Sequence, residues 1–558
     1  MLNNIKVKNM KTKNLKFGVA ITAVLAFSMS AFTQSDIVWK KNFGGSGSDS
    51  YYSVIAVSDG IIAVGASQNS SFGNGDLIDF TGKGGYDAII VKYDNSDNIV
   101  WKKNFGGSDA DYFYGLTSVS DGIIAVGQSY SGSFGNGDWT GVTGKGESDA
   151  TIVKFDNAGN VVWKKNFGGG TPGYANNDNY FNSVIVVSDG IIAVGSSDYA
   201  CFGTGDWTGI SGGSGRDAII VKFDNAGNVL WKTSFSTIVA PMYGDDDGFF
   251  SVTAVSDGVI AVGDKYSMYM GTQSNDAIIV KYDNYGNYVW DKTLNGSAHY
   301  DSYQGITTVS DGIVAVGNST ERSFNNGIWA GIAGKGGTDA IIVKYDNAGN
   351  VLWKKNFGGS DPDYFEYITT ISDGFLVAGK AYVNNTGDWT GLTGKGDEDA
   401  IIVKYDFNGN VQWKKSFGGK GIDDYHSVVA VSDGIVAAGE SYAIPLIGIG
   451  SSFGNGDLID LTGNGGGDAI IVKYSLSNTS IQELYQSPIA ISPSPATDFI
   501  SVSGLQGNEM LYVYNINGQQ LLSRKASGET EQIAVSHLPT GIYLLKTNDG
   551  QMIKWVKK

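Results

Sequence analysis

The sequence is poor in cysteine, proline, histidine and glutamate, and each shortage excludes a class of protein. Among 558 residues there are one Cys, 8 Pro and 3 His. A single Cys excludes a disulfide within the chain, and few prolines beside 80 Gly exclude collagen and proline-rich disordered chains. Only nine of the 56 acidic residues are Glu. Because Asp favours turns and Glu favours helices, this imbalance predicts an all-β protein.

Basic residues are fewer than acidic residues, and five of the basic residues lie near the N-terminus. The formal net charge is -17, yet the first 35 residues carry five Lys and no acidic residue, so the remainder is more acidic still. An acidic surface repels phosphate backbones and anionic lipids. We therefore expect neither nucleic acid nor a membrane surface as a partner.

Long apolar runs are missing after the first 35 residues. The five lysines precede an apolar run over residues 17–32, and small and polar residues follow it. This order is that of a secretory signal peptide, which we place at residues 1–33 with cleavage near Thr33 and Gln34. No later run approaches the 18 apolar residues of a membrane helix, so we expect no transmembrane segment in the mature chain.

The middle of the chain repeats one unit seven times. Three markers recur at intervals of 54 to 69 residues: a Trp, a Ser-Asp-Gly turn, and an Asp-Ala-Ile/Thr-Ile-Val-Lys run. Their positions are Trp39, Trp101, Trp163, Trp231, Trp290, Trp353 and Trp413; Asp59, Asp121, Asp189, Asp257, Asp311, Asp373 and Asp433; and Asp87, Asp149, Asp217, Asp276, Asp339, Asp399 and Asp468. A period of this length indicates a solenoid, an array or a propeller.

The ends of the repeat favour a closed ring. Each unit holds two hairpins, hence four strands, and the first three strands are nearly continuous apolar runs. The chain enters on a lone fourth strand at residues 37–43, and the last unit stops after Tyr474 without one. The two fragments complete one blade, whereas a solenoid would need two caps. We predict a seven-bladed β-propeller over residues 36–476, closed by the N-terminal strand.

The repeat unit resembles that of the bacterial seven-bladed β-propeller (SBBP) repeat proteins. The shared pattern is Gly-Gly-x-x-x-Asp, a hairpin ending in Val-x-Gly, and then Asp-Ala, hydrophobic residues, Lys, and Asp-x-x-Gly-Asn before the Trp. The resemblance covers about residues 36–476 and implies the same propeller fold.

A different pattern begins after a linker at residues 477–486. Residues 487–558 alternate apolar and polar residues between Gly turns, which is typical of a small β-sandwich. Pro493-Ser-Pro-Ala-Thr-Asp498, Leu511-Tyr-Val-Tyr-Asn-Ile-Asn-Gly518 and Leu538-Pro-Thr-Gly-Ile-Tyr543 resemble, in order, the motifs of the type A sorting domain of the Bacteroidetes type IX secretion system. This resemblance implies that the type IX machinery is a partner. It also implies a secreted or outer-membrane surface location.

Phe-Gly-Asn-Gly-Asp-Trp loops are the first candidate ligand site. An aromatic ring beside a carboxylate suits a sugar, because the ring stacks on its apolar face and the carboxylate accepts from its hydroxyls. The candidate residues are Asp138, Trp139, Asp206, Trp207, Trp329, Asp388 and Trp389. In the alternative each Trp packs against its own blade. We favour that alternative, because a motif in nearly every blade more often serves the repeat than a ligand.

Clustered carboxylates are the second candidate site. Asp245, Asp246 and Asp247 stand together in the least regular unit, the fourth, and Asp clusters bind Ca²⁺ in many proteins. No cluster has the Asp-x-Asp-x-Asp-Gly spacing of a calcium loop. We therefore expect these side chains to cap backbone amides, with Ca²⁺ as the alternative and no other cofactor.

Catalytic motifs are scarce, so we predict a non-enzymatic binding or adhesion module for a glycan or a surface protein. His299, His426 and His537 show no metal-ligand spacing, and an active site would be sought near the fourth unit, His299 and His426. Two alternatives stay open: a structural surface protein without a discrete ligand, and a polysaccharide lyase or hydrolase. Asp, Glu and His side chains peculiar to single blades around the central channel would favour the enzyme. Exposed Trp-Asp pairs would favour the binding module.

Overall fold

The structure is a computed structural model of the whole chain. It describes residues 37–170, 177–213, 215–236, 246–269, 272–294, 300–443, 450–475, 490–492, 495–503, 505, 509–515, 520–528, 530–547 and 552–558. The predicted signal peptide, the linker at 477–486 and His299 lie outside these residues. The chain divides into two compact units, residues 1–476 and 477–558.

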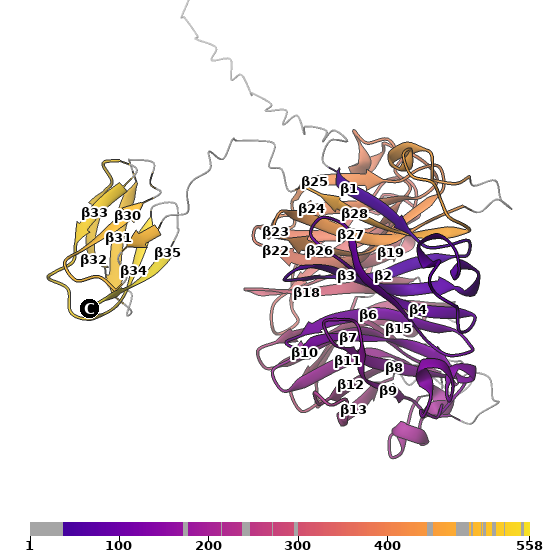
Figure 1. Cartoon of the computed structure of the whole chain (residues 1–558). Coiled ribbons are helices and arrows are strands. Elements are labelled where there is room, and N and C mark those ends of the chain that lie inside the picture. The colour runs from indigo at the N-terminus through magenta and orange to yellow at the C-terminus, as the bar shows by residue number, and fades with distance from the viewer. Residues whose placement is uncertain are drawn as a thin grey trace, which may run out of the picture. The chain divides into compact units, whose positions relative to one another are not determined.

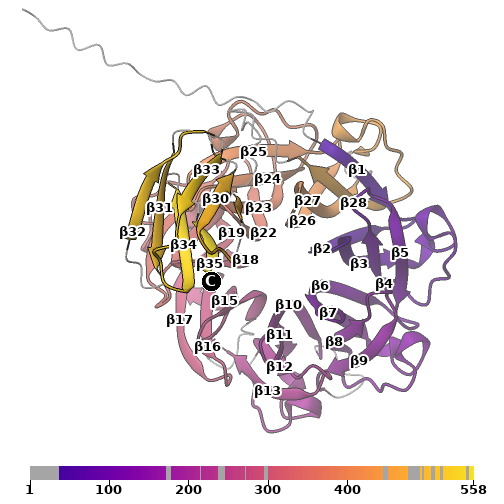
Figure 2. The ribbon, with the colours of Figure 1, turned by 60° about the vertical axis from the view of Figure 1, so that its left-hand side comes forward.

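The first unit is a ring of seven four-stranded antiparallel sheets arranged about one central axis (Figures 1 and 2). Each sheet is one blade, numbered here in chain order. The strands of blades 1 to 4 are β2 (Asp49–Val57), β3 (Gly60–Gln68), β4 (Tyr86–Tyr93), β5 (Ile99–Phe105); β6 (Asp111–Val119), β7 (Gly122–Tyr130), β8 (Ser148–Phe155), β9 (Val161–Phe167); β10 (Asn179–Val187), β11 (Gly190–Asp198), β12 (Arg216–Phe223), β13 (Val229–Phe235); and β14 (Gly248–Val255), β15 (Gly258–Tyr269), β16 (Thr272–Asp283), β17 (Tyr288–Leu294). Those of blades 5 to 7 are β18 (Asp301–Val309), β19 (Gly312–Thr320), β20 (Thr338–Tyr345), β21 (Val351–Phe357); β22 (Asp363–Ile371), β23 (Gly374–Ala381), β24 (Asp399–Tyr405), β25 (Val411–Phe417); and β26 (Ile422–Val431), β27 (Gly434–Tyr442), β28 (Gly467–Tyr474).

The N-terminal strand closes the ring, as the sequence predicts. β1 (Ile37–Phe43) pairs antiparallel with β28, from Ile37 opposite Tyr474 to Phe43 opposite Ala469. The order of the last sheet is therefore β1-β28-β27-β26. This pairing confirms the all-β, seven-bladed propeller.

The two middle strands of each blade are buried on both faces, which explains their apolar runs. In β3 the residues Ile61 to Val64 are at most 3% exposed, and in β4 the residues Ile89 to Val91 are fully buried. Each blade packs between two neighbours, so both faces of its sheet lie in a core.

The innermost strand of every blade contains a β-bulge at the same place. The register with the second strand shifts across one residue, for example between Tyr51 and Ser53. The bulged residues are Tyr52, Tyr114, Asn182, Phe250, Gln304, Glu366 and His426. All seven line one cavity, which lies between the innermost strands and is called the central channel below. A bulge re-aims a side chain, and here it turns one side chain per blade inward.

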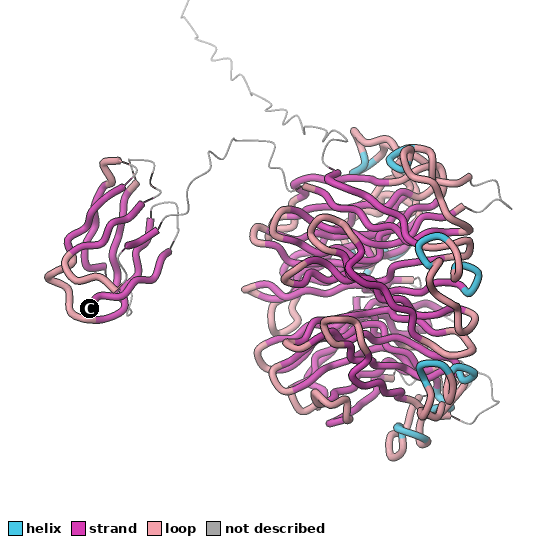
Figure 3. The backbone as a smooth tube through the Cα atoms, in the orientation of Figure 1, coloured by secondary structure: helices cyan, strands magenta, loops and turns pink. Residues whose placement is uncertain are grey.

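The two faces of the ring differ. The tight Ser-Asp-Gly turns lie on one face, and the long loops lie on the other with most of the short 3-10 turns (Figure 3). These turns are η2 (Asn69–Ser71), η3 (Gly75–Leu77), η4 (Ser131–Ser133), η5 (Gly137–Trp139), η6 (Tyr199–Cys201), η7 (Gly205–Trp207), η8 (Glu321–Ser323), η9 (Gly327–Trp329), η10 (Gly387–Trp389) and η12 (Gly456–Leu458). In blade 4 the second and third strands instead extend into one long hairpin, β15–β16.

The second unit consists of two small antiparallel sheets that share one apolar core. The sheets are β29 (Ala490–Ser492), β30 (Phe499–Ser503) and β33 (Thr530–Ala534), and β32 (Gln520–Lys525), β31 (Met510–Asn515), β34 (Gly541–Thr547) and β35 (Met552–Lys557). Trp555 is fully buried among Leu511, Val513 and Leu545. The arrangement confirms the predicted small β-sandwich. Within the described parts of the chain, no helix has the length and apolarity needed to cross a membrane.

Candidate functional site

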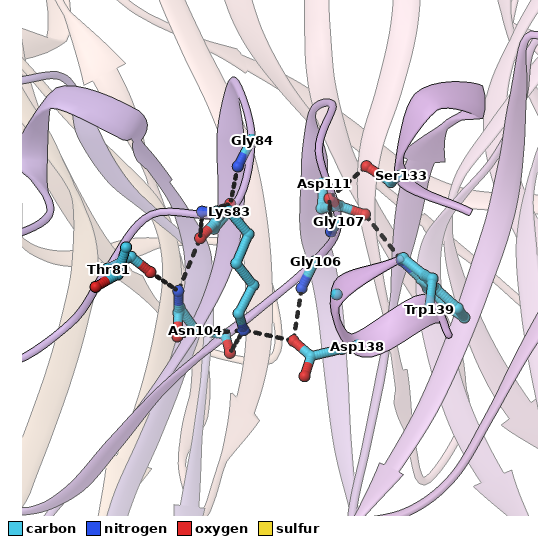
Figure 4. A network of polar contacts seen from close by, with 12 residues as sticks. Thr81, Lys83, Gly84, Asn104, Gly106, Gly107, Asp111, Ser133, Asp138 and Trp139 are labelled. Atoms are coloured by element: carbon cyan, nitrogen blue, oxygen red, sulfur yellow. Dashed lines mark hydrogen bonds and ion pairs between the residues drawn. The ribbon is translucent and has the colours of Figure 1, made fainter. Parts of the chain in front are cut away.

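The tryptophans of the Gly-Asp-Trp loops are core residues, which corrects the glycan-stacking hypothesis. Trp139, Trp207, Trp329 and Trp389 are all 0% exposed. The Trp139 indole donates to the Asp111 carboxylate at 2.9 Å (Figure 4). Its ring packs edge-on against Phe105, with ring centroids 4.9 Å apart. A fully buried ring offers no face to a sugar. The favoured alternative, in which each Trp packs against its own blade, describes these loops.

The aspartates of the same motif fasten neighbouring blades. The Asp138 carboxylate accepts from the Gly106 amide at 2.9 Å and pairs with Lys83 of the preceding blade at 2.5 Å (Figure 4). The same ion pair recurs as Lys145–Asp206, Lys335–Asp388 and Lys395–Asp457. Gly137 has φ 50°, and a Cβ there would lie 2.3 Å from the Gly106 carbonyl oxygen, which explains the invariable Gly of the motif.

Blade 5 departs from the motif for a local reason. Ile328 stands where Asp138 stands in blade 2. The preceding blade, the fourth, replaces the lysine-bearing loop by the β15–β16 hairpin. Because that loop supplies the Lys in the other pairs, an Asp at position 328 would lack its partner. The aspartates predicted to bind ligand are thus explained by contacts between blades.

The acidic run of blade 4 caps backbone amides where it is described. Asp247 is 1% exposed and accepts from the Tyr266 amide at 2.8 Å, and Asp246 accepts from the Arg216 amide at 3.2 Å. Asp245 lies outside the described residues. Among those that are described, the group of side chains that could hold a metal ion lies elsewhere, at Glu366, Asp424 and His426.

The channel holds the strongest candidate site. The seven bulged residues and their neighbours line a cavity of about 330 Å³. The residues that build the blades recur from unit to unit, whereas the bulged position is Tyr, Tyr, Asn, Phe, Gln, Glu and His in chain order. A blade needs no particular side chain there, so the variety points to a single asymmetric site.

One wall of this site is charged and comes from blades 6 and 7. His426 Nδ1 lies 2.7 Å from Glu366 Oε2 and 4.0 Å from Asp424 Oδ2, and its Nε2 lies 3.8 Å from Glu440 Oε1. Lys380 Nζ lies 3.2 Å from Asp424 Oδ2 and 3.4 Å from a Glu398 oxygen. Asp424 and Glu440 are register partners on β26 and β27, so adjacent strands bring these carboxylates together.

Burial and mutual charge shift the pKa values of this group. Burial and the neighbouring Glu366 raise the pKa of Asp424 to about 7, although His426 and Lys380 oppose the shift. Burial alone would lower the pKa of His426, but the carboxylates of Asp424 and Glu366 raise it well above its usual value. Burial alone would raise the pKa of Glu366, but the paired His426, together with Lys380, lowers it. The imidazole is thus held as a cation between carboxylates when no ligand is present.

The adjoining wall is aromatic. Tyr86, Tyr112, Tyr114 and Tyr52 form a continuous series of ring contacts that ends at His426, with successive centroids 5.5, 5.7, 5.5 and 5.7 Å apart. All five side chains are partly exposed. Tyr86 begins β4 and Tyr112 is the second residue of β6, so the series starts at the long-loop face and runs into the channel.

Of this site, sequence reasoning named only His426, as one of three places to look for an active centre. It missed Glu366, Lys380, Asp424, Glu440 and the tyrosine series. A signal was available, because the bulged residue is always the third after the Asp or Asn near the start of the inner strand, from Asp49 and Tyr52 to Asp423 and His426. Aligning the seven units at that Asp or Asn would have shown that the bulged position varies more than any other position of the strand.

Comparison with known proteins identifies the C-terminal unit. Residues 490–558 match the model of the secretion system C-terminal sorting domain. Over 194 residues the chain is 24% identical to the regulatory protein FlaEY of Caulobacter vibrioides, a match that covers 34% of this chain and 19% of that protein.

Several solved structures are similar to this chain at low sequence identity. The WD40 β-propeller domain of Doa1 is 10% identical over 79% of this chain and 97% of that one, with a TM-score of 0.39. The phage phi92 endosialidase is 10% identical over 92% and 87%, with a TM-score of 0.38. A putative 6-phosphogluconolactonase of Bacteroides fragilis is 14% identical over 67% and 86%, with a TM-score of 0.34. The fold assignment depends on the strand pairing described above, and these likenesses carry no argument about function.

Strand pairing and the matched C-terminal domain together define what the chain is. The sorting domain directs export by the type IX secretion system, which confirms the predicted location. The chain is a seven-bladed β-propeller protein with a type IX sorting domain, secreted or displayed at the outer-membrane surface.

Proposed function

We propose that this protein is a non-enzymatic binding module that holds a glycan at the long-loop mouth of its central channel. The observation that carries the proposal is the charged and aromatic lining of the channel, which differs from blade to blade while the rest of each unit repeats. Display of a glycan-binding channel at the cell surface makes the protein an adhesion module. Within this proposal the repeats are of the bacterial seven-bladed propeller type and the organism is one of the Bacteroidetes.

The chemistry of the lining suits a sugar. Tyr52, Tyr112 and Tyr114 offer partly exposed rings for stacking on the apolar face of a pyranose. Glu366, Gln304 and Asn182 line the same cavity and supply acceptors and donors for hydroxyls. At about 330 Å³ the cavity lies near the lower end of the usual range of ligand sites, about 300–1,000 Å³. We therefore expect recognition of a chain end or a short side branch rather than of a long stretch of polymer.

A glycan-array screen tests the proposal. The purified protein is compared with Tyr114→Ala, in the channel, and with Tyr285→Ala, a matched change at a Tyr that is 81% exposed on an outer turn. We expect glycan binding that falls at least tenfold in Tyr114→Ala, because a stacking ring is lost, and that is unchanged in Tyr285→Ala. Absence of glycan binding, or equal binding by both variants, contradicts the proposal and favours a protein ligand or a structural surface role.

A second candidate function is a polysaccharide lyase or hydrolase, and the contacts of Glu366, Asp424 and His426 favour it. Carboxyl groups with separated pKa values beside an imidazole can serve as acid and base. Incubation with the glycans that bind, followed by an assay of new reducing ends and of unsaturated products, separates the two functions. Product formation that is lost in Glu366→Gln would replace the binding module by the enzyme.

A further inference from the structure

We infer that Glu366, Asp424 and His426 form a site for one divalent transition-metal ion, with Zn²⁺ as the representative, on the wall of the channel. The inference deepens the proposed function, because the ion would present an open coordination position to the bound glycan. Metal binding by itself does not depend on a glycan, so each claim can fail without the other.

The donor atoms are close enough to share one ion. One imidazole nitrogen and one oxygen from each of two carboxylates lie within 4.8 Å of one another. Zn–N and Zn–O bonds of about 2.0–2.2 Å place donors of a tetrahedral site about 3.3 Å apart. The distances from His426 Nδ1 to Glu366 Oε2 and Asp424 Oδ2, 2.7 and 4.0 Å, lie on either side of that value. Small side-chain adjustments would therefore admit the ion.

A buried oxygen gives independent support. The Asp424 side chain is 3% exposed, and its Oδ1 has no hydrogen-bond partner among the described residues. Its Oδ2 faces Lys380, which also faces Glu398 and so offsets part of the negative charge. Leaving a buried carboxylate oxygen without a donor costs about 1–3 kcal/mol or more. A metal ion bound by both oxygens of Asp424 would satisfy Oδ1.

A carboxylate also lies near the far side of the imidazole. When Nδ1 binds the ion, Nε2 carries the proton, and Glu440 Oε1 lies 3.8 Å from Nε2. A carboxylate behind the distal nitrogen fixes the tautomer and orients the ring, as in many zinc sites. His426 Nε2 has no hydrogen-bond partner among the described residues, and a small side-chain movement would bring Glu440 within hydrogen-bond distance of it. Glu440 would then be a positioning residue that does not itself bind the metal.

The ligand set selects the kind of ion. One nitrogen and two carboxylates without a thiolate suit Zn²⁺, Co²⁺, Ni²⁺ or Cu²⁺, whereas Ca²⁺ requires six to eight oxygens. Three protein ligands leave a fourth position for water or a ligand, as in functional rather than purely structural zinc sites. Glu366 and His426 both line the cavity, so that position opens into it.

Titration of ZnCl₂ into tag-free, chelator-treated protein tests the site. We expect one Zn²⁺ per chain, with affinity at least tenfold weaker in His426→Gln and in Glu366→Gln. The matched controls are His537→Gln, at an exposed His of the second unit, and Glu321→Gln, at an exposed Glu of η8. Both variants should bind Zn²⁺ as the unmodified protein does. No saturable binding up to millimolar Zn²⁺, or undiminished binding by His426→Gln, would overturn the inference.

A spectroscopic test covers the case in which a variant fails to fold. Cu²⁺ added in equal amount to the unmodified protein should give an electron paramagnetic resonance spectrum with superhyperfine coupling to one imidazole nitrogen, and labelling with ¹⁵N-histidine should change that coupling. A spectrum with oxygen ligands only contradicts the site. If glycan binding survives chelation, the ion does not take part in glycan binding, and the proposed function as a binding module is unaffected. If the protein binds Zn²⁺ but no glycan, the metal site is supported and the proposed glycan-binding function is contradicted.

Discussion

At the scale of the residue, Trp139 illustrates how a conspicuous side chain can serve its own blade. Its indole satisfies the buried Asp111 carboxylate, whose other oxygen accepts from the Gly107 amide at 2.8 Å and the Ser133 hydroxyl at 2.7 Å. Ring, carboxylate and loop form one connected hydrogen-bond network (Figure 4). The Trp therefore ties the Gly-Asp-Trp loop to the start of β6.

Trp139→Ala should destabilise the propeller without a direct effect on ligand binding. Removal of a fully buried aromatic ring costs about 3–5 kcal/mol, and here it also leaves the Asp111 oxygen without its indole donor. The midpoint of urea unfolding measures the loss, and Trp101→Ala, at a partly exposed Trp of the outermost strand, provides the smaller reference change. A midpoint unchanged by Trp139→Ala, together with lost glycan binding, would restore the stacking role.

At the scale of the element, one strand joins the two ends of the ring. β1 supplies the fourth strand of blade 7, and Phe43 at its end is 1% exposed. Without β1, the edge of β28 would present unpaired backbone groups and an uncovered apolar surface. Closure by β1 therefore stabilises a sheet whose other strands lie more than 370 residues later in the chain.

Deletion of residues 37–43 should lower the free energy of unfolding by at least about 3 kcal/mol, since the loss of Phe43 alone approaches that value. Limited proteolysis and size-exclusion chromatography would show earlier cleavage and self-association through the freed edge. A chain that begins at residue 36 is the control. Equal protease resistance of the two chains would show that blade 7 is stable with three strands.

The repeat made the strands and blades predictable from the sequence, but it gave no indication of the candidate site in the channel. Strand number, blade number and ring closure follow from patterns that recur seven times, as with Trp39 and Trp101. The contact between Glu366 and His426 joins residues 60 positions apart, and it exists only because two neighbouring blades turn one residue each into the same channel. No local sequence spacing predicts the contact between Glu366 and His426.

At the scale of the whole molecule, buried aspartates set the response to pH. Burial raises the pKa of Asp264, Asp363 and Asp399 to about 7, and those of Asp111 and Asp149 to about 6. In the unfolded chain these groups titrate near 3.9. Between about pH 4 and 7 the folded protein therefore binds more protons than the unfolded chain does.

The free energy of unfolding falls with rising pH wherever the folded protein binds more protons than the unfolded chain. Stability should therefore fall as pH rises through this window. We expect a higher melting temperature at pH 5 than at pH 8, measured by calorimetry. Asp399→Asn, which cannot ionise, should show a smaller difference. Below about pH 4, stability should fall again, since hydrogen bonds to exposed carboxylates such as Asp156 lower their pKa values. A melting temperature that rises from pH 5 to pH 8 contradicts this account.

Removal of the second unit should change location and leave the propeller folded. The sorting domain holds its own core around Trp555, separate from the cores of the blades. A chain that ends at residue 476 should accumulate in the periplasm, detected by fractionation and immunoblotting, while the complete chain reaches the surface or the medium. Equal export of both chains would show that residues 490–558 are not needed as a secretion signal.

The sequence by itself determined the architecture and the cellular location of this protein. Strand periodicity, turn residues and a sevenfold repeat are local or recurring signals, and the sorting motifs are read along one segment. Only the tertiary structure decided which side chains face a ligand. It buried Trp139 and its counterparts, paired Asp138 with Lys83 of another blade, and gathered Glu366, Asp424 and His426 in the channel. The physical reason is that exposure and side-chain proximity depend on how blades pack around the ring, and no single repeat contains that information.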